Sequence, residues 1–332
     1  MDSERRPRLT PAVADVRRAV RAALPEDGLV LVALSGGPDS LALAAATAFE
    51  AKRVGIRAGA VVVDHGLQSG SADVATRAVE QARGLGLDPV SSVVVFVDRS
   101  GGPEAAARTA RYAALDFAAK ETGAVVVLLG HTLDDQAETV LLGLARGSGP
   151  TSLHGMAAST SSATGPTYVR PLLDIRRAMT VQFCIDSGLD PWIDPQNSDE
   201  AFARVRVRNT VLPMLERELG PGVAEALART AEQLREDSDA LDHFAEEIAE
   251  ELADLAESGI SLPVRALATN PAALRQRLIR LAVESEFHVS LSRAQTLEVA
   301  RLVTHWHGQK ALDLPGVRVE RQGGLLIFTA TK

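Results

Sequence analysis

The chain has a single cysteine, few aromatic residues and no long apolar run. Because Cys184 is alone among 332 residues, a disulfide framework and a cluster of cysteine metal ligands are both excluded. Aromatic residues make up only 4% of the sequence. No apolar run approaches the length of a membrane span, and the charged N-terminus lacks a signal-peptide core. We therefore expect a cytoplasmic protein with no membrane segment.

Lysine is also scarce, so nearly all of the positive charge is carried by arginine, the better side chain for two-pronged contacts with phosphate. The composition is otherwise ordinary for a globular protein, with 46% hydrophobic and 23% charged residues. A net charge of −8 argues against indiscriminate binding to nucleic acid, although it allows a local basic surface. The length is sufficient for two domains.

The most informative stretch is the ten-residue segment Leu31–Ser40. Four apolar residues predict a buried strand, Ser35-Gly36-Gly37 ends it, and Pro38 suits the first turn of a helix. Glycines let backbone N–H groups approach an anion, and a helix N-terminus adds positive potential. Asp39 is unusual beside phosphates unless it holds Mg²⁺. The spacing and the missing lysine exclude a Walker A loop.

Apolar strand segments alternate with helical segments over the first 146 residues. Continuous apolar strands are typical of a parallel sheet that is covered by helices on both faces. The expected strands are residues 29–34, 58–65, 90–97 and 124–129, and the expected helices are residues 11–24, 38–52, 71–85, 103–122 and 133–146. We therefore predict a doubly wound α/β domain, with Ser71 as the cap of the third of these helices.

Polar segments follow three of the predicted strands. They are Ser35–Ser40, Asp64-His65 and His131–Asp135. Since the carboxyl ends of parallel strands meet at one edge, where ligands bind in such sheets, we expect an active site there.

The remainder of the chain is less regular. Residues 147–165 are rich in glycine, serine and threonine and are expected to form a loop, followed by a helix over residues 175–187. Beyond the loop, a further helix carries Arg204, Arg206 and Arg208.

Beyond residue 220 the sequence becomes acidic with a helical pattern, and we place the domain boundary near residues 213–220. It gives a catalytic domain over residues 1–215 and a smaller, mainly helical domain over residues 216–332. Within the second domain we expect an acidic helical segment over residues 221–257, helices over 271–285 and 292–305, and a β tail over 310–332.

The helix that follows His131 carries an acidic pair. Asp134 and Asp135 fall in its first turn, where capping alone favours carboxylates. Capping does not explain Glu138, which lies three residues after Asp135 and therefore on the same face. A carboxylate pair facing the strand ends suits a cationic substrate better than a phosphate.

Arginines offer the opposite charge. Arg108 and Arg111 follow Glu104 at helical spacing, with Tyr112 beside them. A surface Glu–Arg pair is the ordinary interpretation of such a stripe, and Arg204 and Arg206 are equally compatible with a solvated helix face. The histidines His65, His154, His305 and His307 have no partners at metal-ligand spacing, so we expect no zinc site.

The loop Ser35–Ser40 resembles the PP-loop of the ATP pyrophosphatase superfamily, whose adenine-nucleotide alpha-hydrolase-like domains split ATP into AMP and pyrophosphate. Taken together, several segments resemble the tRNA(Ile)-lysidine synthetase family. They are Ser35–Ser40, Val63–Leu67, Glu104 with Ala107–Tyr112, Gly130–Thr139, Arg146–Gly149 with Leu153–Met156, Arg170–Leu173, and Asp194–Arg208 followed by Leu212-Pro213. They cover most of residues 29–215 in order, which makes the resemblance specific.

The resemblance implies an ATP-dependent modification of tRNA(Ile) that bears a CAU anticodon. ATP adenylates the C2 carbonyl of the wobble cytidine, and the ε-amine of free L-lysine then displaces AMP to give lysidine. Codon reading thereby changes from AUG to AUA. The C-terminal domain is expected to recognise the tRNA, and the sequence leaves open whether the protein is a homodimer.

The resemblance also suggests roles for particular residues. ATP is expected to contact Ser35, Gly36, Gly37, Pro38, Asp39 and Ser40 in the loop, together with Val63, His65 and His131. Asp39 is the expected Mg²⁺ ligand. Arg108 or Arg111, with Arg204 or Arg206, is expected to neutralise the α-phosphate.

Asp135 and Glu138 are expected to bind the lysine ammonium group and to help deprotonate it, since free lysine is protonated at pH 7. His131 is also expected to orient the nucleotide or the tRNA.

Three alternatives have different requirements. A tRNA thiolase usually carries sulfur on paired cysteines, which Cys184 alone does not provide. An amidotransferase-type synthetase needs an ammonia source, and no glutaminase domain is apparent. A non-catalytic nucleotide sensor gains nothing from three carboxylates beside its phosphate site.

Overall fold

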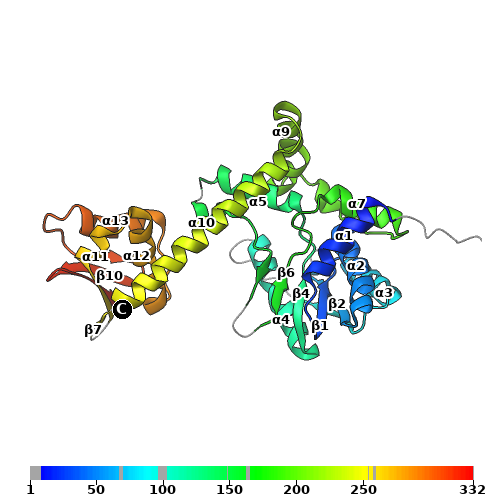
Figure 1. Ribbon diagram of the computed structural model, residues 1–332, viewed down its shortest axis with the longest axis horizontal. Helices are drawn as coiled ribbons and strands as arrows, with labels where there is room; N and C mark the ends of the chain where they lie inside the picture. Colours follow the sequence, from blue (N-terminus) through cyan, green and yellow to red (C-terminus); the bar gives the residue numbers. More distant parts are fainter. Residues whose placement is uncertain are drawn as a thin grey trace, which may run out of the picture. The chain divides into compact units, whose positions relative to one another are not determined.

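The computed structural model describes residues 9–66, 70–95, 103–147, 149–161, 165–252, 254–256 and 259–331. The chain divides into two compact units, Met1–Glu232 and Gln233–Lys332. The first contains a six-stranded sheet and the second a five-stranded sheet (Figure 1). In the described part of the chain, no helix combines the length and the apolar character needed to cross a membrane.

The sheet of the first unit is parallel except at one edge, which confirms the predicted α/β fold. Its strands are β1 (Leu29–Ala33), β2 (Arg57–Asp64), β3 (Val90–Val94), β4 (Ala124–Leu128), β5 (Ser159–Thr160) and β6 (Thr167–Val169). They lie in the order β3-β2-β1-β4-β6-β5, and only β5 runs antiparallel to its neighbour. Strands β2 and β3 lie on one side of β1, and the later strands lie on its other side. The topological switch point therefore lies between β1 and β4.

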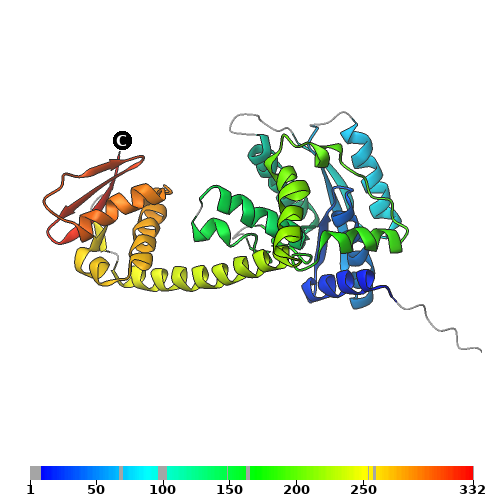
Figure 2. The ribbon, with the colours of Figure 1, turned by 90° about the horizontal axis from the view of Figure 1, so that it is seen from above.

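Alternate residues of the central strands face two different layers. Val30 and Val32 pack against one group of helices, whereas Leu29 and Leu31 pack against α4 (Pro103–Thr122). The first group consists of α1 (Pro11–Ala23), α2 (Pro38–Val54), α3 (Ser71–Gly84) and α7 (Arg177–Asp186). Figure 2 shows the sheet between these layers. Because both faces are covered, the strands are apolar throughout, as the sequence predicted.

Several local expectations were wrong. The segment expected to be a loop contains α6 (Pro150–Leu153) and β5, and β6 then extends the sheet, because strands this short carry no detectable apolar alternation. Helix α3 is preceded by Gly70 at φ +85° and has no side-chain cap from Ser71, which is its first residue. The last two residues of the strand expected over 90–97 lie outside the described part.

A helical segment with a local π-turn follows α7 in the chain and contacts α5 (Leu133–Ala145). The segment consists of η1 (Pro195–Ser198), α8 (Ala203–Arg206), the π-turn η2 (Val207–Val211) and α9 (Leu212–Leu219). Pro213 has no N–H and would clash with the carbonyl group of Asn209 in a regular helix, so a wider turn at this point relieves the conflict.

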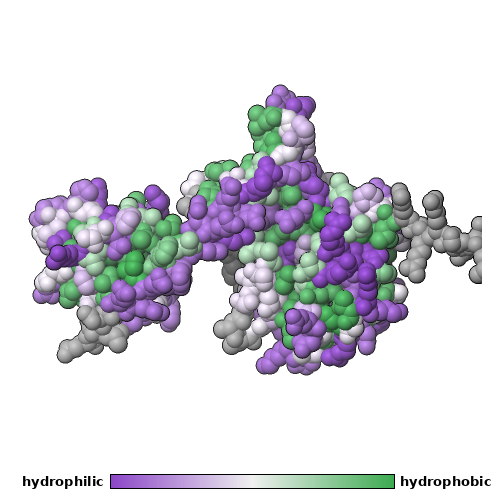
Figure 3. Space-filling view, in the orientation of Figure 1, coloured by the Kyte–Doolittle hydropathy of each residue, from purple (hydrophilic) through white to green (hydrophobic). Residues whose placement is uncertain are grey.

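The second unit is only partly helical. Helix α10 (Val223–Leu252) begins in the first unit and ends in the second, and its surface is mainly hydrophilic (Figure 3). It is followed by β7 (Asp254–Ala256), β8 (Gly259–Pro263), α11 (Val264–Thr269), α12 (Ala272–Phe287), α13 (Arg293–Thr304), β9 (Leu312–Leu314), β10 (Val317–Gln322) and β11 (Leu325–Ala330).

The strands of this unit form an antiparallel sheet in the order β7-β8-β11-β10-β9, which packs on the helices around Leu278, Ile279 and Phe328. The β tail was expected, but β7 and β8 were not. β7 replaces the end of the helix expected to reach residue 257.

Candidate active site

The loop between β1 and α2 is held in a tight turn by its own serines. The Ser40 hydroxyl accepts from the Ser35 N–H at 3.2 Å, lies 3.1 Å from the Ser35 hydroxyl, and donates to the Gly37 carbonyl at 3.0 Å. Gly36 has φ +84°, a left-handed conformation that favours glycine. No side chain caps the N-terminus of α2, so its first backbone N–H groups face the loop and suit an anion.

The loops after β1 and β4 are in direct contact at the switch point. A Cβ atom on Gly130 would lie only 3.1 Å from the Ser40 nitrogen and 3.2 Å from the Asp39 carbonyl carbon. On the other side, the Trp192 N–H donates to the Gly36 carbonyl at 2.9 Å. The site is therefore built where the fold places ligands.

Asp39 is partly buried beside the first turn of α7. The Thr180 hydroxyl donates to one oxygen of its carboxylate, and Nε of Arg177 lies 3.4 Å from the other. Burial raises the pKa of Asp39 above its ordinary value, while Thr180 and Arg177 oppose that rise. Burial therefore disfavours the ionised form of this carboxylate, while Thr180 and Arg177 stabilise its negative charge.

The same arginine also reaches the acidic pair of α5. Arg177 donates to Asp135 at 2.7 Å and to Glu138 at 3.0 Å. Arg208 adds a two-pronged pair with Glu138, at 2.7 and 3.0 Å, and a contact with Asp135 at 3.3 Å. Three carboxyl groups, including Asp39, therefore surround two guanidinium groups. The carboxylates do share one face of α5 and do lie beside the loop, as the sequence predicted.

The structure changes the interpretation of this pair. Glu138 is completely buried, and both of its oxygens accept hydrogen bonds from arginine. One oxygen of Asp135 accepts from the Thr132 N–H at 2.8 Å and from its hydroxyl at 2.9 Å, which is the capping role. Arginines therefore already neutralise much of the charge of Glu138, while the expected binding of the lysine ammonium group by this pair stays a prediction.

In a second group of arginines, only Arg204 approaches a described carboxylate, at 3.9 Å from Glu138. Arg108, Arg111, Arg170 and Arg204 gather beside His131 and are close enough to perturb one another. Among the described side chains, Nε of Arg111 and Nε of Arg170 are buried without a hydrogen-bond partner. Burial and then the neighbouring guanidinium groups lower the pKa of Arg111. Arg170 is buried and Arg111 is partly buried, and an anionic group stabilises cations that lie at such depth without a counter-charge.

Two histidines border the arginine cluster. Nδ1 of His131 and Nδ1 of His65 are likewise buried without a partner among the described atoms. Burial, reinforced by three arginines, lowers the pKa of His131 to about 4, and burial followed by Arg111 lowers the pKa of His65. His131 is therefore neutral at pH 7 and contributes a polar ring rather than a charge. Val63, another expected nucleotide contact, is partly buried in β2 at the same edge.

The structure separates the two arginines predicted in the helix after residue 199. Arg204 belongs to the site, since it donates to the Thr139 hydroxyl at 3.1 Å and lies 3.9 Å from Glu138. Arg206 instead donates to the backbone carbonyls of Glu200 and Ala201, and no described contact joins it to the site. The proposal of Arg206 as a phosphate ligand is therefore not supported.

Four functional side chains had no assigned role in the sequence. Arg177 and Thr180 lie on α7, Arg208 in the π-turn and Arg170 after β6. Arg170 and Arg208 fall in segments that carried the family resemblance, which is a signal for them. Arg177 and Thr180 have no local pattern that distinguishes them.

A Mg²⁺ site has partial support here. Among the described residues, no group of three histidine, cysteine or acidic side chains has the arrangement of a metal site. The carboxylate of Asp39 has the hard oxygen atoms that Mg²⁺ prefers, and it lies in the loop where phosphates would add further oxygens. One protein carboxylate together with substrate phosphates is the usual Mg²⁺ environment, so the residue present fits the ion.

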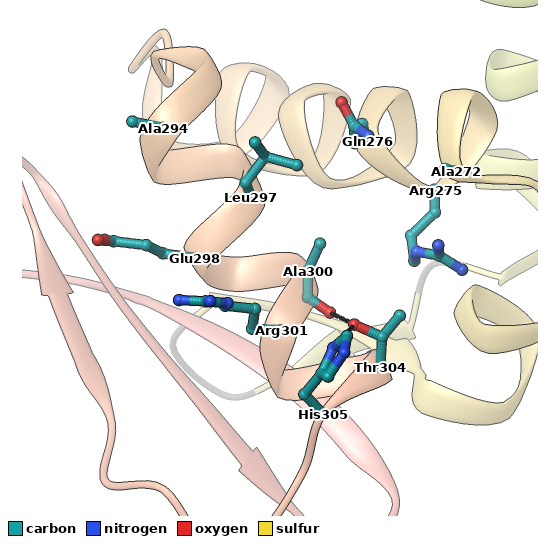
Figure 4. A pocket seen from close by; sticks show the side chains of 10 residues that line it. All are labelled: Ala272, Arg275, Gln276, Ala294, Leu297, Glu298, Ala300, Arg301, Thr304 and His305. Carbon is teal, nitrogen blue, oxygen red and sulfur yellow. Dashed lines mark hydrogen bonds between the residues drawn. The ribbon is translucent and has the colours of Figure 1, made fainter.

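The second unit contains a separate cavity between α12 and α13. Its volume is about 450 Å³, and its lining includes Arg275, Arg301 and His305 (Figure 4). The Thr304 hydroxyl donates to the Ala300 carbonyl at 3.1 Å and lies 2.8 Å from Nδ1 of His305. Glu298 also lines the cavity, so its lining carries both signs of charge.

Comparison with known proteins assigns both parts of the chain. Residues 11–215 match the PP-loop domain family, and residues 262–326 match the TilS substrate binding domain family. A curated tRNA(Ile)-lysidine synthase from Leifsonia xyli subsp. xyli is 64% identical over 301 residues, covering 90% of this chain and 89% of the relative. One from Thermobifida fusca is 51% identical over 326 residues, covering 96% and 98%.

A solved structure shows the same fold at low sequence identity. The U34-tRNA thiolase NcsA from Methanococcus maripaludis, with its [4Fe-4S] cluster, has a TM-score of 0.57 and 20% identity, covering 68% of this chain and 80% of that protein. At this identity the likeness concerns the fold alone. The curated relatives, in contrast, match along almost their whole length, and so this chain belongs to the tRNA(Ile)-lysidine synthase family.

Proposed function

We propose that the protein ligates free L-lysine to C2 of the wobble cytidine of tRNA(Ile) with a CAU anticodon, using ATP and releasing AMP and pyrophosphate. The observation that carries the proposal is the division of the site into two regions of opposite character. His131 is within electrostatic range of both, since Arg108, Arg111 and Arg170 act on its ring and so does Asp135 of the acidic cluster. An adenylated tRNA and the ammonium group of lysine need these two environments side by side.

The first step uses the loop and the arginine cluster. The N-terminus of α2 and the loop Ser35–Ser40 hold the β- and γ-phosphates. A Mg²⁺ ion on Asp39 would neutralise phosphate charge when bound. Cytidine O2 attacks the α-phosphorus, a new P–O bond forms, and pyrophosphate leaves. Arg111 and Arg204 stabilise the negative charge that develops on the α-phosphoryl oxygens.

The second step uses the acidic region. Three carboxyl groups face the guanidinium groups of Arg177 and Arg208. Arg204 adds a third positive charge, 3.9 Å from Glu138. The ammonium group of lysine binds beside these carboxylates, with Asp135 as the nearer one because Glu138 is fully buried. After losing a proton, the amine attacks C2 and the C–O bond to AMP breaks. Arginines that compensated the α-phosphate also stabilise the leaving AMP.

Recognition of tRNA is assigned to the second unit, residues 233–332. Its segment 262–326 carries nine arginines and lysines against five acidic residues, although the whole chain is acidic. The cavity lined by Arg275 and Arg301 lies in this segment. A local basic surface of this kind suits the phosphate backbone of RNA, whose recognition depends on shape and on phosphate and ribose contacts.

The thiolase alternative requires a reactive cysteine, and Cys184 is the only one in the sequence. Its thiol is buried and donates to the Pro38 carbonyl at 3.5 Å, and burial, followed by the charge of Asp39, raises its pKa to about 12. A thiol held protonated is unsuited to carrying sulfur as a thiolase does.

One experiment tests the proposal against its rivals. Pyrophosphate release from ATP is measured with tRNA(Ile) transcript, with and without each amino acid, and the digested tRNA is analysed for lysidine by mass spectrometry. We expect release that needs the tRNA and lysidine that needs lysine. Release without any lysine adduct, or a product that requires a sulfur donor, would contradict the proposal.

A further inference from the structure

Tyr112 is the common contact of the arginine cluster. The Cζ atoms of Arg108 and Arg111 lie 5.0 and 5.8 Å from the centroid of its ring, within the range of cation–π attraction. Its hydroxyl oxygen accepts from Arg170 at 3.2 Å and from Arg108 at 3.5 Å. One neutral side chain therefore contacts three guanidinium groups that repel one another.

The contrast with the acidic region shows why a neutral contact matters. Arg177 and Arg208 are held by carboxylates, which cancel their charge. Arg111 and Arg170 have no ion pair with a described carboxylate, and each keeps an unpartnered Nε. Glu104 lies one helical turn before Arg108, but its side chain is outside the described part. A π-face and a hydroxyl oxygen attract cations without removing their net charge.

Tyr112 is itself fixed by the second tyrosine of the chain. Tyr168 on β6 is buried and meets the Tyr112 ring at a centroid distance of 4.9 Å and an angle of 65°, an edge-to-face geometry. The Tyr168 hydroxyl donates to Asp116 at 2.6 Å. The ring that contacts the arginines is thus anchored to the sheet and not merely to its own helix.

We propose that Tyr112 is a positioning residue that gathers three arginines into one anion-binding cluster without neutralising their charge. The assignment rests on the proposed function, in which this cluster compensates the α-phosphate and the departing AMP. Tyr112 makes no bond to the substrate in this scheme. Its contacts determine the positions of the three guanidinium groups.

The test compares two ligands that the proposed function assigns to different places. Binding of AMP and of pyrophosphate is measured by calorimetry for the wild type, Tyr112→Leu, Tyr112→Phe and the control Tyr168→Phe. AMP probes the arginine cluster and pyrophosphate probes the loop Ser35–Ser40. Tyr168→Phe removes a tyrosine hydroxyl from the same pair of rings but none of the contacts to arginine.

We expect Tyr112→Leu to weaken AMP binding about tenfold or more, because both the π-face and the acceptor are lost. Tyr112→Phe should weaken it by a few fold, and Tyr168→Phe should match the wild type. Pyrophosphate affinity should stay unchanged in all three variants, which a general structural defect would not allow.

Three results would overturn the assignment: no AMP binding by the wild type, full AMP binding by Tyr112→Leu, or equal loss of both ligands in a variant whose thermal midpoint is unchanged. Failure of the proposed function is a separate outcome. In that case the wild type makes no lysidine, although the order of AMP affinities among the variants holds.

Discussion

Glu138 and Arg208 form a two-pronged ion pair beneath the loop that follows β1. The guanidinium group donates at 2.7 and 3.0 Å to a carboxylate that is completely shielded from solvent. Arg177 donates to the same carboxylate at 3.0 Å. Glu138 is therefore an anchor for two arginines, which come from α7 and from the π-turn.

Replacing Glu138 by Gln should destabilise the fold, because two partly buried arginines lose one of their carboxylate partners and must share Asp135. We expect a loss of about 3 kcal/mol in the free energy of unfolding, measured with urea. Pyrophosphate release and lysidine formation, followed in single turnover on the same samples, should fall together. The matched control is Asp313→Asn, whose exposed pair with Arg318 should contribute less than about 1 kcal/mol. If only lysidine formation fell, Glu138 would be a direct lysine ligand after all.

Asp39→Asn should abolish pyrophosphate release while the fold stays intact. Burial raises the pKa of Asp39, so a neutral amide avoids a cost that the carboxylate bears. We expect an unchanged or slightly higher thermal midpoint at pH 7 and a decrease of about a hundredfold or more in pyrophosphate release with Mg²⁺. Turnover near the wild-type rate in Mg²⁺ would show that Asp39 is not the metal ligand.

His131 should make the stability depend on pH. Its pKa is about 4 in the folded protein against an ordinary 6.5. Between pH 4 and 6.5 this histidine is protonated in the unfolded chain but neutral in the folded protein. Its contribution to the free energy of unfolding is therefore complete above pH 6.5 and is lost as the pH falls toward 4. The loss amounts to about 3 kcal/mol. His131→Asn should flatten urea-unfolding free energies measured from pH 7.5 to 4.5, whereas an unchanged slope would contradict the assignment.

Arg301 should contribute to tRNA binding through phosphate. It is exposed on α13 and lines the cavity of the second unit. Arg301→Ala should weaken binding of tRNA(Ile) and reduce the slope of log K against log salt by about 0.7 to 0.9 for one lost phosphate contact. Arg53→Ala, at the far end of α2 from the loop, is the control and should leave both quantities unchanged. Equal effects of the two variants would indicate nonspecific attraction only.

A shortened chain should separate nucleotide binding from tRNA discrimination. The structure places the better cut after Glu232 and not near Leu215, because Ala224 and Leu227 of α10 pack against Leu133 of α5. We expect residues 1–232 to bind ATP but to lose discrimination against the elongator methionine tRNA, which also has a CAU anticodon. Retained discrimination in competition binding would remove the recognition role from the second unit.

The sequence by itself determined the parallel sheet, the loop Ser35–Ser40 and the acidic face of α5. Each depends on signals within about ten residues: apolar runs, a glycine turn, or i, i+3 spacing. The short strands β5, β6 and β7 were not predicted, because two or three residues are too few to show a period.

Only the tertiary structure decided what the charged residues do. Asp39 meets Arg177 across 138 positions, and Glu138 meets Arg208 across 70. No local pattern encodes such pairs, since their geometry exists only once β1, α5, α7 and the π-turn have converged. The ion pairs that Arg177 and Arg208 make with the acidic pair of α5 are therefore visible only in the folded structure. Arg108 and Arg111, in contrast, contact the neutral ring of Tyr112 and no described carboxylate, so their positive charge is not cancelled.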